Sequence, residues 1–331
     1  MLYSAFGLRI QSNIEIPGFL RLSDHPPADV AVTFGSLPAW LDPVVPPDQD
    51  AWHISPDLGR NGVPSSRVWK VRDGAYLRIF YDDATDCVVD RSGTNVWISW
   101  LAPNAVEDVV PYLQGQLLGL VLRLRGMTCL HASSIVVGQQ AIAIAGPKGF
   151  GKSSTAAAFL GMGYPILADD VTPVYEEAGK FMVRPAHARL WLYPDMVETL
   201  YGSSDALPQF ASSWEKRYLD LNSSGPGQPG EPKPLRAIYV LAERSDEPDL
   251  PSVAKAGPHD TMLELLCNTY INHLLDPETR SREFALLGRL QQSVPLRVVR
   301  PHENPSRIFQ LCEKILEDVA SLEAPLKAAS L

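Results

Sequence analysis

The feature that most constrains this chain is a glycine-rich segment near its middle. Residues 146–153 read Gly-Pro-Lys-Gly-Phe-Gly-Lys-Ser, a full match to the pattern G-x-x-x-x-G-K-[ST]. The run 141–145 predicts a strand that leads into this segment, and residues 153–160 predict a helix that leaves it. A strand, a glycine-rich loop and a helix in this order predict a phosphate-binding loop. The glycines let successive N–H groups point at phosphate oxygens, and the helix N-terminus adds partial positive charge.

The pattern assigns roles to individual residues. Lys152 is expected to reach the β- and γ-phosphates of a nucleotide, and the Ser153 hydroxyl is expected to bind Mg²⁺. We therefore predict ATP and Mg²⁺ as cofactors. The predicted nucleotide-binding residues are Gly146, Lys148, Gly149, Phe150, Gly151, Lys152, Ser153 and Ser154. The alternative is a glycine-rich turn with an exposed lysine.

Two adjacent carboxylates follow the loop. Asp169 and Asp170 come after the apolar run 164–168, at the end of a predicted strand. Phosphoryl transfer needs a carboxylate near the metal ion, and often a second one that accepts the proton of the acceptor hydroxyl. Because alternate side chains of a strand point to opposite sides, both aspartates can reach one ligand only where the strand frays into a loop. The alternative is a solvated turn.

Three further groups are candidates for the same site. His131 begins the predicted β-hairpin 131–145, whose return strand leads into the loop, so the hairpin could bring His131 near the phosphates. Lys216 and Arg217 are candidate cations for the transferring phosphoryl group, where positive charge stabilises the transition state. Arg189 is a weaker candidate of the same kind. The alternatives are a structural histidine and a solvated basic pair.

The region before the loop predicts a β-rich unit. Runs of β-branched and aromatic residues bounded by Gly, Pro, Asp and Asn predict strands at 28–34, 68–71, 75–81 and 95–101, and residues 43–62 predict a loop. Five of the seven tryptophans lie here, which favours core packing, with a peptide-holding aromatic groove as the alternative. Asn104 and Glu107 have the spacing of a capping box, and apolar residues as far as Leu124 recur at helical spacing.

The rest of the chain predicts a mixture of strands and helices. Strands are expected at 171–175, 181–184, 235–241 and 296–299, helices at 261–275, 284–291 and 308–319, and a Pro/Gly-rich loop at 222–234. The expected fold class is therefore α/β, with an α+β mixed sheet. A chain of 331 residues favours two domains, at roughly 100–200 residues each. We predict a β-rich domain with a bridging helix at 1–125, for substrate recognition, and a catalytic domain at 126–331.

The composition of the chain limits the kinds of binding partner that we expect. With 29 basic and 38 acidic side chains the formal charge is −9, which disfavours a broad surface for nucleic acid or anionic membranes. The most apolar long stretch, 109–121, is interrupted by Pro111 and two glutamines and is too short to span a bilayer. Four cysteines without C-x-x-C spacing indicate reduced thiols. We expect a soluble cytoplasmic protein.

The order of these motifs resembles a known family. Leu130-His131-Ala, the glycine-rich loop and the segment 161–171 with its aspartate pair are similar to the catalytic domain of HPr kinase/phosphorylase, a group related to phosphoenolpyruvate carboxykinases. The resemblance covers about residues 128–175. It implies a P-loop core of that type and transfer of the γ-phosphoryl group of ATP to a serine. It also implies that Asp169 is the general base, assisted by His131, that Asp170 and Ser153 bind the metal, and that the protein forms homo-oligomers.

The chain also departs from that family. The Glu-Ile-Arg-Gly-Leu-Gly signature is missing, and Arg-Pro-Ala-His-Ala-Arg-Leu stands at about its place in 184–190, so the metal-binding Glu and the reverse, dephosphorylating activity have no visible basis. Relatives with an N-terminal region of similar size accompany lasso-peptide biosynthesis and phosphorylate a precursor serine. The resemblance therefore implies a peptide or small protein as the acceptor. The alternatives are a small-molecule or carboxykinase-like phosphotransferase, and a nucleotide-gated peptide-binding module without transfer.

Overall fold

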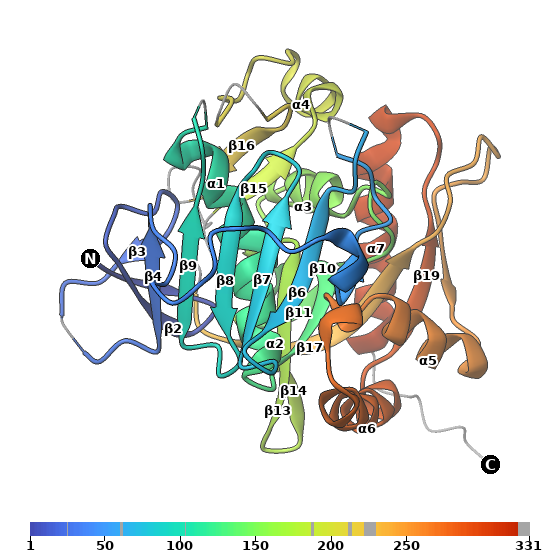
Figure 1. The fold of residues 1–331 in the computed structure, drawn as a ribbon. Coiled ribbons are helices and arrows are strands. Elements are labelled where there is room, and N and C mark those ends of the chain that lie inside the picture. Colours follow the sequence, from blue (N-terminus) through green and yellow to red (C-terminus); the bar gives the residue numbers. More distant parts are fainter. Residues whose placement is uncertain are drawn as a thin grey trace. The chain divides into compact units, whose positions relative to one another are not determined.

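The computed structural model describes residues 1–331 except 25, 60–61, 103, 187–188, 211–213, 222–229 and 324–331. It is a mixed α/β structure with two large mixed sheets (Figure 1). The chain divides into two compact units. The first comprises Met1–Thr128, Phe210–Trp214 and Ile271–Arg280, and the second comprises Cys129–Gln209, Glu215–Tyr270 and Ser281–Leu331. The sequence predicts a boundary near residue 125 and gives no sign of the two later segments of the first unit. Most of the predicted loop 222–234 lies outside the described residues.

The described part of the first unit forms a sheet with strand order β3-β1-β2-β4-β9-β8-β7-β6-β5, of which β9, β8, β7 and β6 are seen side by side in Figure 1. Strand β4 is parallel to β2 and to β9, and the other pairs are antiparallel. The strands are β1 (Leu2–Ala5), β2 (Leu8–Ser12), β3 (Leu20–Arg21), β4 (Val30–Phe34), β5 (His53–Ile54), β6 (Ser66–Val71), β7 (Tyr76–Tyr81), β8 (Asp86–Asp90) and β9 (Asn95–Ser99). All four predicted strands are confirmed within two residues, whereas the predicted loop 43–62 contains β5 and a 3₁₀ turn, η1 (Asp48–Asp50).

One continuous helical segment completes the main part of the first unit. It comprises α1 (Val106–Tyr112), a π-helical turn η2 (Leu113–Leu117) and α2 (Leu118–Leu124). The predicted capping residues are wrong by one position. The Asp108 carboxylate, not Glu107, accepts the N–H of Ala105 at 2.8 Å, while the Asn104 amide donates to the carbonyl of Asp83 at 3.0 Å.

The tryptophans of this unit make packing contacts. Trp69 is buried, and its Nε1 donates to the carbonyl of Pro47 at 3.2 Å. The centres of the Trp40 and Tyr76 rings are 4.4 Å apart. The guanidinium of Arg72 also lies over the Trp40 ring, 4.0 Å from its centre. These contacts agree with the packing interpretation of the aromatic residues.

The second unit contains the second large sheet. Its strands are β10 (Thr128–Val137), β11 (Gln140–Ala145), β12 (Ile166–Ala168), β13 (Val171–Glu177), β14 (Lys180–Val183), β17 (Lys233–Leu241), β18 (Ser252–Lys255) and β19 (Leu296–Arg300). The predicted hairpin is present as the antiparallel pair β10–β11. Strand β17 is parallel to β11 and to β19, so the carboxyl ends of these three strands lie at one edge of the sheet. A separate ribbon pairs β15 (Arg189–Leu192) with β16 (Arg217–Asp220).

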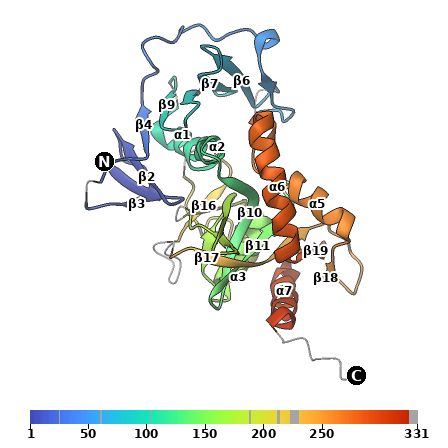
Figure 2. The ribbon, with the colours of Figure 1, turned by 90° about the horizontal axis from the view of Figure 1, so that it is seen from below.

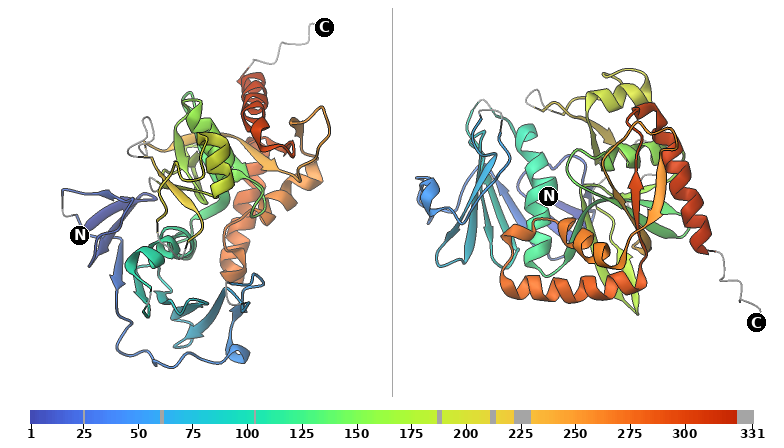
Figure 3. Two further views of the ribbon diagram at one scale, coloured as in Figure 1. Left: turned by 90° about the horizontal axis from the view of Figure 1, so that it is seen from above. Right: turned by 90° about the vertical axis from the view of Figure 1, so that its right-hand side faces the viewer.

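Helices cover both faces of this sheet. Strand β11 alternates between two cores. Ile142 and Ile144 pack with α3 (Lys152–Gly161) and α7 (Ile308–Glu323), while Ala141, Ala143 and Ala145 pack on the side of α5 (Pro258–Cys267) and α6 (Pro277–Ser293). The backbones of these helices can be followed in Figures 2 and 3. The short helix α4 (Pro194–Tyr201) joins the first of these cores. Among the described residues no helix combines the length and apolar character that a bilayer crossing requires.

The helix predicted at 261–275 is wrong in its second half. Helix α5 ends at Cys267, and a 3₁₀ turn, η3, occupies Asn272–Leu274. Between them, residues 268–270 pair with the start of β10. The N–H of His131 donates to the carbonyl of Asn268 at 2.7 Å, and the N–H of Tyr270 donates to the carbonyl of Cys129 at 2.8 Å. These backbone hydrogen bonds replace the ones that a longer helix would have formed.

Candidate active site

The glycine-rich loop connects β11, which ends at Ala145, to α3, which begins at Lys152. The strand, loop and helix predicted from the motif are therefore present. Gly146, Gly149 and Gly151 have φ angles of +142°, +85° and +102°, a region that side chains with a Cβ atom rarely adopt. At Gly146 a Cβ atom would also lie 3.1 Å from the carbonyl oxygen of Leu241. The backbone of the loop thus depends on glycine at the two positions that the pattern requires, Gly146 and Gly151, and also at Gly149 between them.

Lys152 is folded back onto this loop. Its side chain is buried, and Nζ donates to the carbonyls of Gly146 at 2.8 Å and Pro147 at 3.0 Å. Burial lowers the pKa of the ammonium group, and the nearby charges of Asp170 and Asp169 act in the opposite direction. The first N–H groups of a helix have no acceptor within the helix, so the N-terminus of α3 and Lys152 offer donors at the same place.

Asp169 lies beneath the loop and is 3% exposed. Its Oδ1 accepts a hydrogen bond from the Ser133 hydroxyl at 2.5 Å, and its Oδ2 accepts one from the Ser153 hydroxyl at 3.1 Å. Burial raises the pKa of this carboxyl and the charge of Asp170 adds to the effect, while the two serine hydrogen bonds oppose it. Asp169 is therefore connected directly to the first turn of α3 and to β10.

Asp170 has different surroundings, although it is the next residue. Its side chain is 42% exposed, with Oδ1 3.3 Å from His131 Nε2, and its Oδ2 accepts a hydrogen bond from the Tyr270 hydroxyl at 3.0 Å. Burial would raise the pKa of this carboxyl, but His131, Tyr270 and the charge of Lys216 outweigh it and lower the pKa to about 2.

The backbone separates the two aspartates. Asp170 has a φ of +64°, and the N–H of Val171 donates to the carbonyl of Asp169 at 2.7 Å, so a tight three-residue turn interrupts the chain between β12 and β13. A non-glycine residue in this region is strained, and such strain concentrates at functional sites. From the sequence we expect the strand to give way to a loop at the aspartate pair, and the structure has this interruption.

Tyr270 is a site residue that the sequence does not reveal. It lies 100 positions from Asp170, and the pairing of residues 268–270 with the start of β10 places its ring edge-on to the His131 ring, with centres 5.7 Å apart. The next residue, Ile271, has a φ of +53°, which is unusual for a β-branched side chain. It is also the first residue of a segment that belongs to the other unit.

One cleft of about 1180 Å³, counting the part open to solvent, is lined by Lys152, Asp170, His131 and Tyr270 but not by Asp169. It brings together nine of the predicted residues: His131, Lys148, Gly149, Gly151, Lys152, Ser153, Ser154, Asp170 and Lys216. The Lys216 ammonium lies 4.8 Å from the centre of the Tyr193 ring. Trp191, Tyr193, Asp195, Met196, Arg244 and Tyr270 also line the cleft and are not indicated by any sequence motif.

Five predicted residues do not line the cleft, and the first of these is the buried Asp169 described above. Arg217 donates to the Asp205 carboxylate at 2.9 Å and to the carbonyl of Ser204, so the structure does not bring its guanidinium to the cleft. Arg189 is buried with its guanidinium over the Tyr218 ring. Gly146 lies behind the loop against Leu241, and Phe150 lines an adjoining pocket.

The oxygen atoms around Ser153 fit Mg²⁺. In nucleotide sites this ion is held by one or two carboxylates, by waters and by the phosphates of the substrate rather than by a complete protein cage. The Ser153 hydroxyl and the Asp169 carboxylate are in contact at the N-terminus of α3, and Asp170 follows directly. These are hard oxygen donors beside the place where the loop would hold phosphates.

Comparison with known proteins finds no family model and no curated protein that matches the chain. Among solved structures, the chain is similar to the Hpr(Ser) kinase/phosphatase from Coxiella burnetii, with 15% sequence identity and a TM-score of 0.30. The similarity covers 58% of this chain and 93% of that one. A likeness of this size establishes neither the family nor the activity, which have to be argued from the site.

Proposed function

We propose that the protein is an ATP- and Mg²⁺-dependent kinase that transfers the γ-phosphoryl group to the hydroxyl of a serine or threonine in a peptide or protein. One observation carries the proposal: the glycine-rich loop with Lys152 and the Asp170–His131 pair line the same cleft. The first is a binding site for phosphate, and the second is a group that can take a proton. Phosphoryl transfer to a hydroxyl requires both.

The phosphate side consists of backbone and cations. The N–H groups of the loop and of the first turn of α3 bind phosphate oxygens, and Lys152 exchanges its hydrogen bonds with loop carbonyls for bonds to phosphate. Lys216 and Arg244 line the same cleft and add positive charge where the transferring group passes. Ser153 and Asp169 would hold the Mg²⁺ ion, which when bound neutralises charge on the β- and γ-phosphates.

The geometry favours a distribution of the aspartate roles opposite to the one that the family resemblance implies. Asp169 is buried against Ser153, which suits the metal side, whereas Asp170 is open to the cleft between His131 and Tyr270. We therefore assign the acceptor side to Asp170. The acceptor oxygen forms a bond to the γ-phosphorus, the bond to the β–γ bridging oxygen breaks with its electron pair leaving on ADP, and the hydroxyl proton moves to Asp170.

The test is transfer from labelled ATP to serine-containing peptides. Lys152→Ala should abolish transfer, and Lys180→Ala, which removes an exposed lysine on β14, should not change it. Asp170→Asn should lower kcat by about 100-fold, which is the lower end of the range expected when a proton acceptor is lost. Asp169→Asn should instead raise the Mg²⁺ concentration that gives half-maximal rate by about tenfold. If Asp169→Asn loses kcat and Asp170→Asn shifts the Mg²⁺ response, the roles are those that the resemblance implies.

The acceptor class is the second part of the proposal. We assign substrate recognition to the first unit. That the acceptor is a lasso-peptide precursor stays a prediction from the family resemblance. Free serine and small hydroxylated metabolites serve as competing acceptors in the same assay, and transfer to them with the kcat/KM of a peptide would refute a peptide acceptor. Nucleotide binding without transfer to any hydroxyl would favour a nucleotide-gated binding module. The carboxylate of Asp170, held on both oxygens in the cleft, is the observation that speaks against that alternative.

A further inference from the structure

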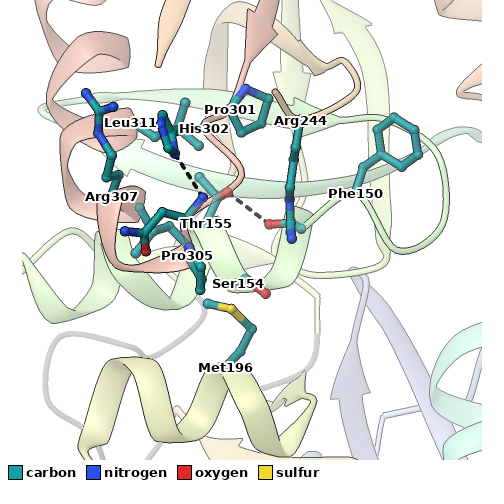
Figure 4. Close-up of a pocket in the computed structure, with 13 residues that line it drawn as sticks. Phe150, Ser154, Thr155, Met196, Arg244, Pro301, His302, Pro305, Arg307 and Leu311 are labelled. Atoms are coloured by element: carbon teal, nitrogen blue, oxygen red, sulfur yellow. Dashed lines mark hydrogen bonds between the residues drawn. The ribbon is translucent and has the colours of Figure 1, made fainter. Parts of the chain in front are cut away.

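A second pocket adjoins the cleft around the N-terminus of α3 (Figure 4). The two share Gly151, Ser154, Met196, Arg244 and Pro305. The other residues of the second pocket come from the loop, from α3 and from the segment after β19, and they are Phe150, Thr155, Pro301, His302, Asn304, Arg307, Ile308 and Leu311. Its volume is about 370 Å³, counting the part open to solvent.

The chemistry of this pocket differs from that of the cleft. No aspartate or glutamate is among the residues that line it, and none of the transfer groups Lys152, Asp170 and His131 reaches it. Two guanidinium groups, Arg244 and Arg307, lie on opposite sides of it in Figure 4. Apolar side chains from Met196, the two prolines, Ile308 and Leu311 complete the lining. Cationic planes over apolar walls suit an uncharged aromatic ring.

Several polar side chains of the pocket offer donors, although the Arg307 guanidinium already donates to Gln310 Oε1 at 2.7 Å and to the carbonyl of Pro248 at 3.4 Å. The Nδ1 atom of His302 accepts the N–H of Asn304 at 2.9 Å, which leaves the proton of the imidazole on Nε2. The Asn304 side-chain oxygen accepts from both the N–H and the hydroxyl of Ser306, so its amide group has only N–H bonds left to offer. Arg244 makes no hydrogen bond or ion pair with any residue that the structure describes. A ring that binds here therefore presents acceptors at its edge, such as ring nitrogens or a carbonyl.

The position in the fold is that of a ligand crevice. The glycine-rich loop follows β11, Arg244 follows β17 and Pro301 follows β19, and these three parallel strands end at the same edge. In α/β sheets ligands bind outside the carboxyl ends of the strands. A nucleotide whose phosphates lie on the loop, with the γ-phosphate in the cleft, has its other end directed away from the transfer groups. The second pocket is the space that continues from the loop in that direction.

We propose that this pocket is the nucleoside subsite, which holds the base and ribose of the nucleoside triphosphate between Arg244 and Arg307. The proposal rests on the nucleotide-binding part of the proposed function. It adds that the base is recognised by stacking and by donated hydrogen bonds from His302 and Asn304, and that this recognition is separate from the binding of the phosphates.

Titration calorimetry on the full chain with Mg²⁺ tests the separation, because ATP contains the nucleoside and inorganic tripolyphosphate does not. Arg307→Ala should weaken ATP binding by about five- to tenfold, the effect of one lost cation–π contact, and leave tripolyphosphate binding within twofold of the wild type. His302→Ala provides a second variant with the same expected pattern. Arg300→Ala, which removes an exposed arginine of β19 outside the pocket, is the matched control and should change neither affinity.

Other outcomes separate the subsite from the proposed function. Unchanged ATP affinity in both variants, or a parallel loss of ATP and tripolyphosphate, overturns the subsite. A wild type that binds tripolyphosphate as tightly as ATP also overturns the subsite but leaves the phosphate-binding loop intact. A wild type that binds neither compound refutes nucleotide binding altogether, and the subsite with it.

Discussion

Replacement of Arg78 tests how the loop between β4 and β5 is held on the sheet of the first unit. Arg78 lies on β7 and is 1% exposed, and its Nη2 is 2.6 Å from the Asp86 carboxylate on β8. Its Nη1 donates to the carbonyls of Asp42 and Val44, both at 2.9 Å. One guanidinium thus neutralises a buried carboxylate and fixes a loop at the same time.

The expected magnitude follows from what the substitution leaves behind. Arg78→Ala leaves the Asp86 carboxylate, whose side chain is 11% exposed, without its counter-charge, and it leaves two carbonyls without their donor. Removing one partner of a buried ion pair costs about 3–5 kcal/mol, because an uncompensated charge remains in the interior. The double variant Arg78→Met/Asp86→Leu removes both charges and should be less destabilised than the sum of the single variants by at least about 2 kcal/mol.

Urea unfolding monitored by tryptophan fluorescence is the suitable assay, since Trp40, Trp52, Trp69, Trp97, Trp100 and Trp214 belong to the first unit and Trp191 is the seventh. Lys314→Ala is the control, because it breaks a surface pair with Glu317 in which both side chains are more than half exposed, and it should not change the midpoint measurably. A loss below about 1 kcal/mol for Arg78→Ala, or strict additivity in the double variant, would refute the reasoning.

Three further predictions concern the site and the pH dependence of stability. Tyr270→Phe removes the donor to Asp170 and should lower kcat about tenfold in steady-state transfer with the KM for ATP unchanged; an equal change in both would indicate a structural role instead. Gly146→Ala forces a Cβ atom against Leu241 at a φ of +142° and should weaken tripolyphosphate binding in calorimetry, whereas Gly179→Ala in the turn between β13 and β14 should not. Burial, with the charges of His53 and Arg280, lowers the pKa of His273 to about 4 from an ordinary value of 6.5. The unfolded chain therefore binds more protons between these values, so the free energy of unfolding should fall as the pH drops from about 6.5 towards 4, and His273→Gln should flatten that part of the curve. An unchanged slope would contradict the shift.

The glycine-rich loop could be predicted from the sequence because its geometry is local. Three glycines at fixed spacing supply the positive φ angles, and the strand and helix on either side are recognisable within twenty residues. The hairpin that connects His131 to the loop strand could also be predicted, whereas a contact between His131 and an aspartate was implied only by the family resemblance. Tyr270 and Arg244 could not be predicted, since each reaches the site from a distant part of the chain through sheet pairing. Ser133 lies in the predicted hairpin, two residues after His131, but no motif marks it.

The failures in the fold have similar causes. Strand β8 was not predicted from the sequence because it begins and ends with aspartates. Asp86 is neutralised by Arg78, and Asp90 accepts hydrogen bonds from Thr94 and Asn95, so all five residues of the strand are buried despite two charges. The helix expected as far as residue 275 ends at Cys267 because the start of β10 provides a better partner for the backbone of residues 268–270. Tertiary hydrogen bonds decided both cases.

The discontinuity of the first unit has a consequence for its synthesis. Trp214 donates to the carbonyl of Asp108 and packs edge-on against Tyr112, and Asp276 pairs with Arg91, so the early residues obtain some of their partners only from much later ones. A ribosome must therefore translate as far as residue 280 before this unit has all of its parts, by which time most of the second unit has emerged. An amino-terminal fragment that stops at residue 125 would be an unfinished structure rather than an isolated domain.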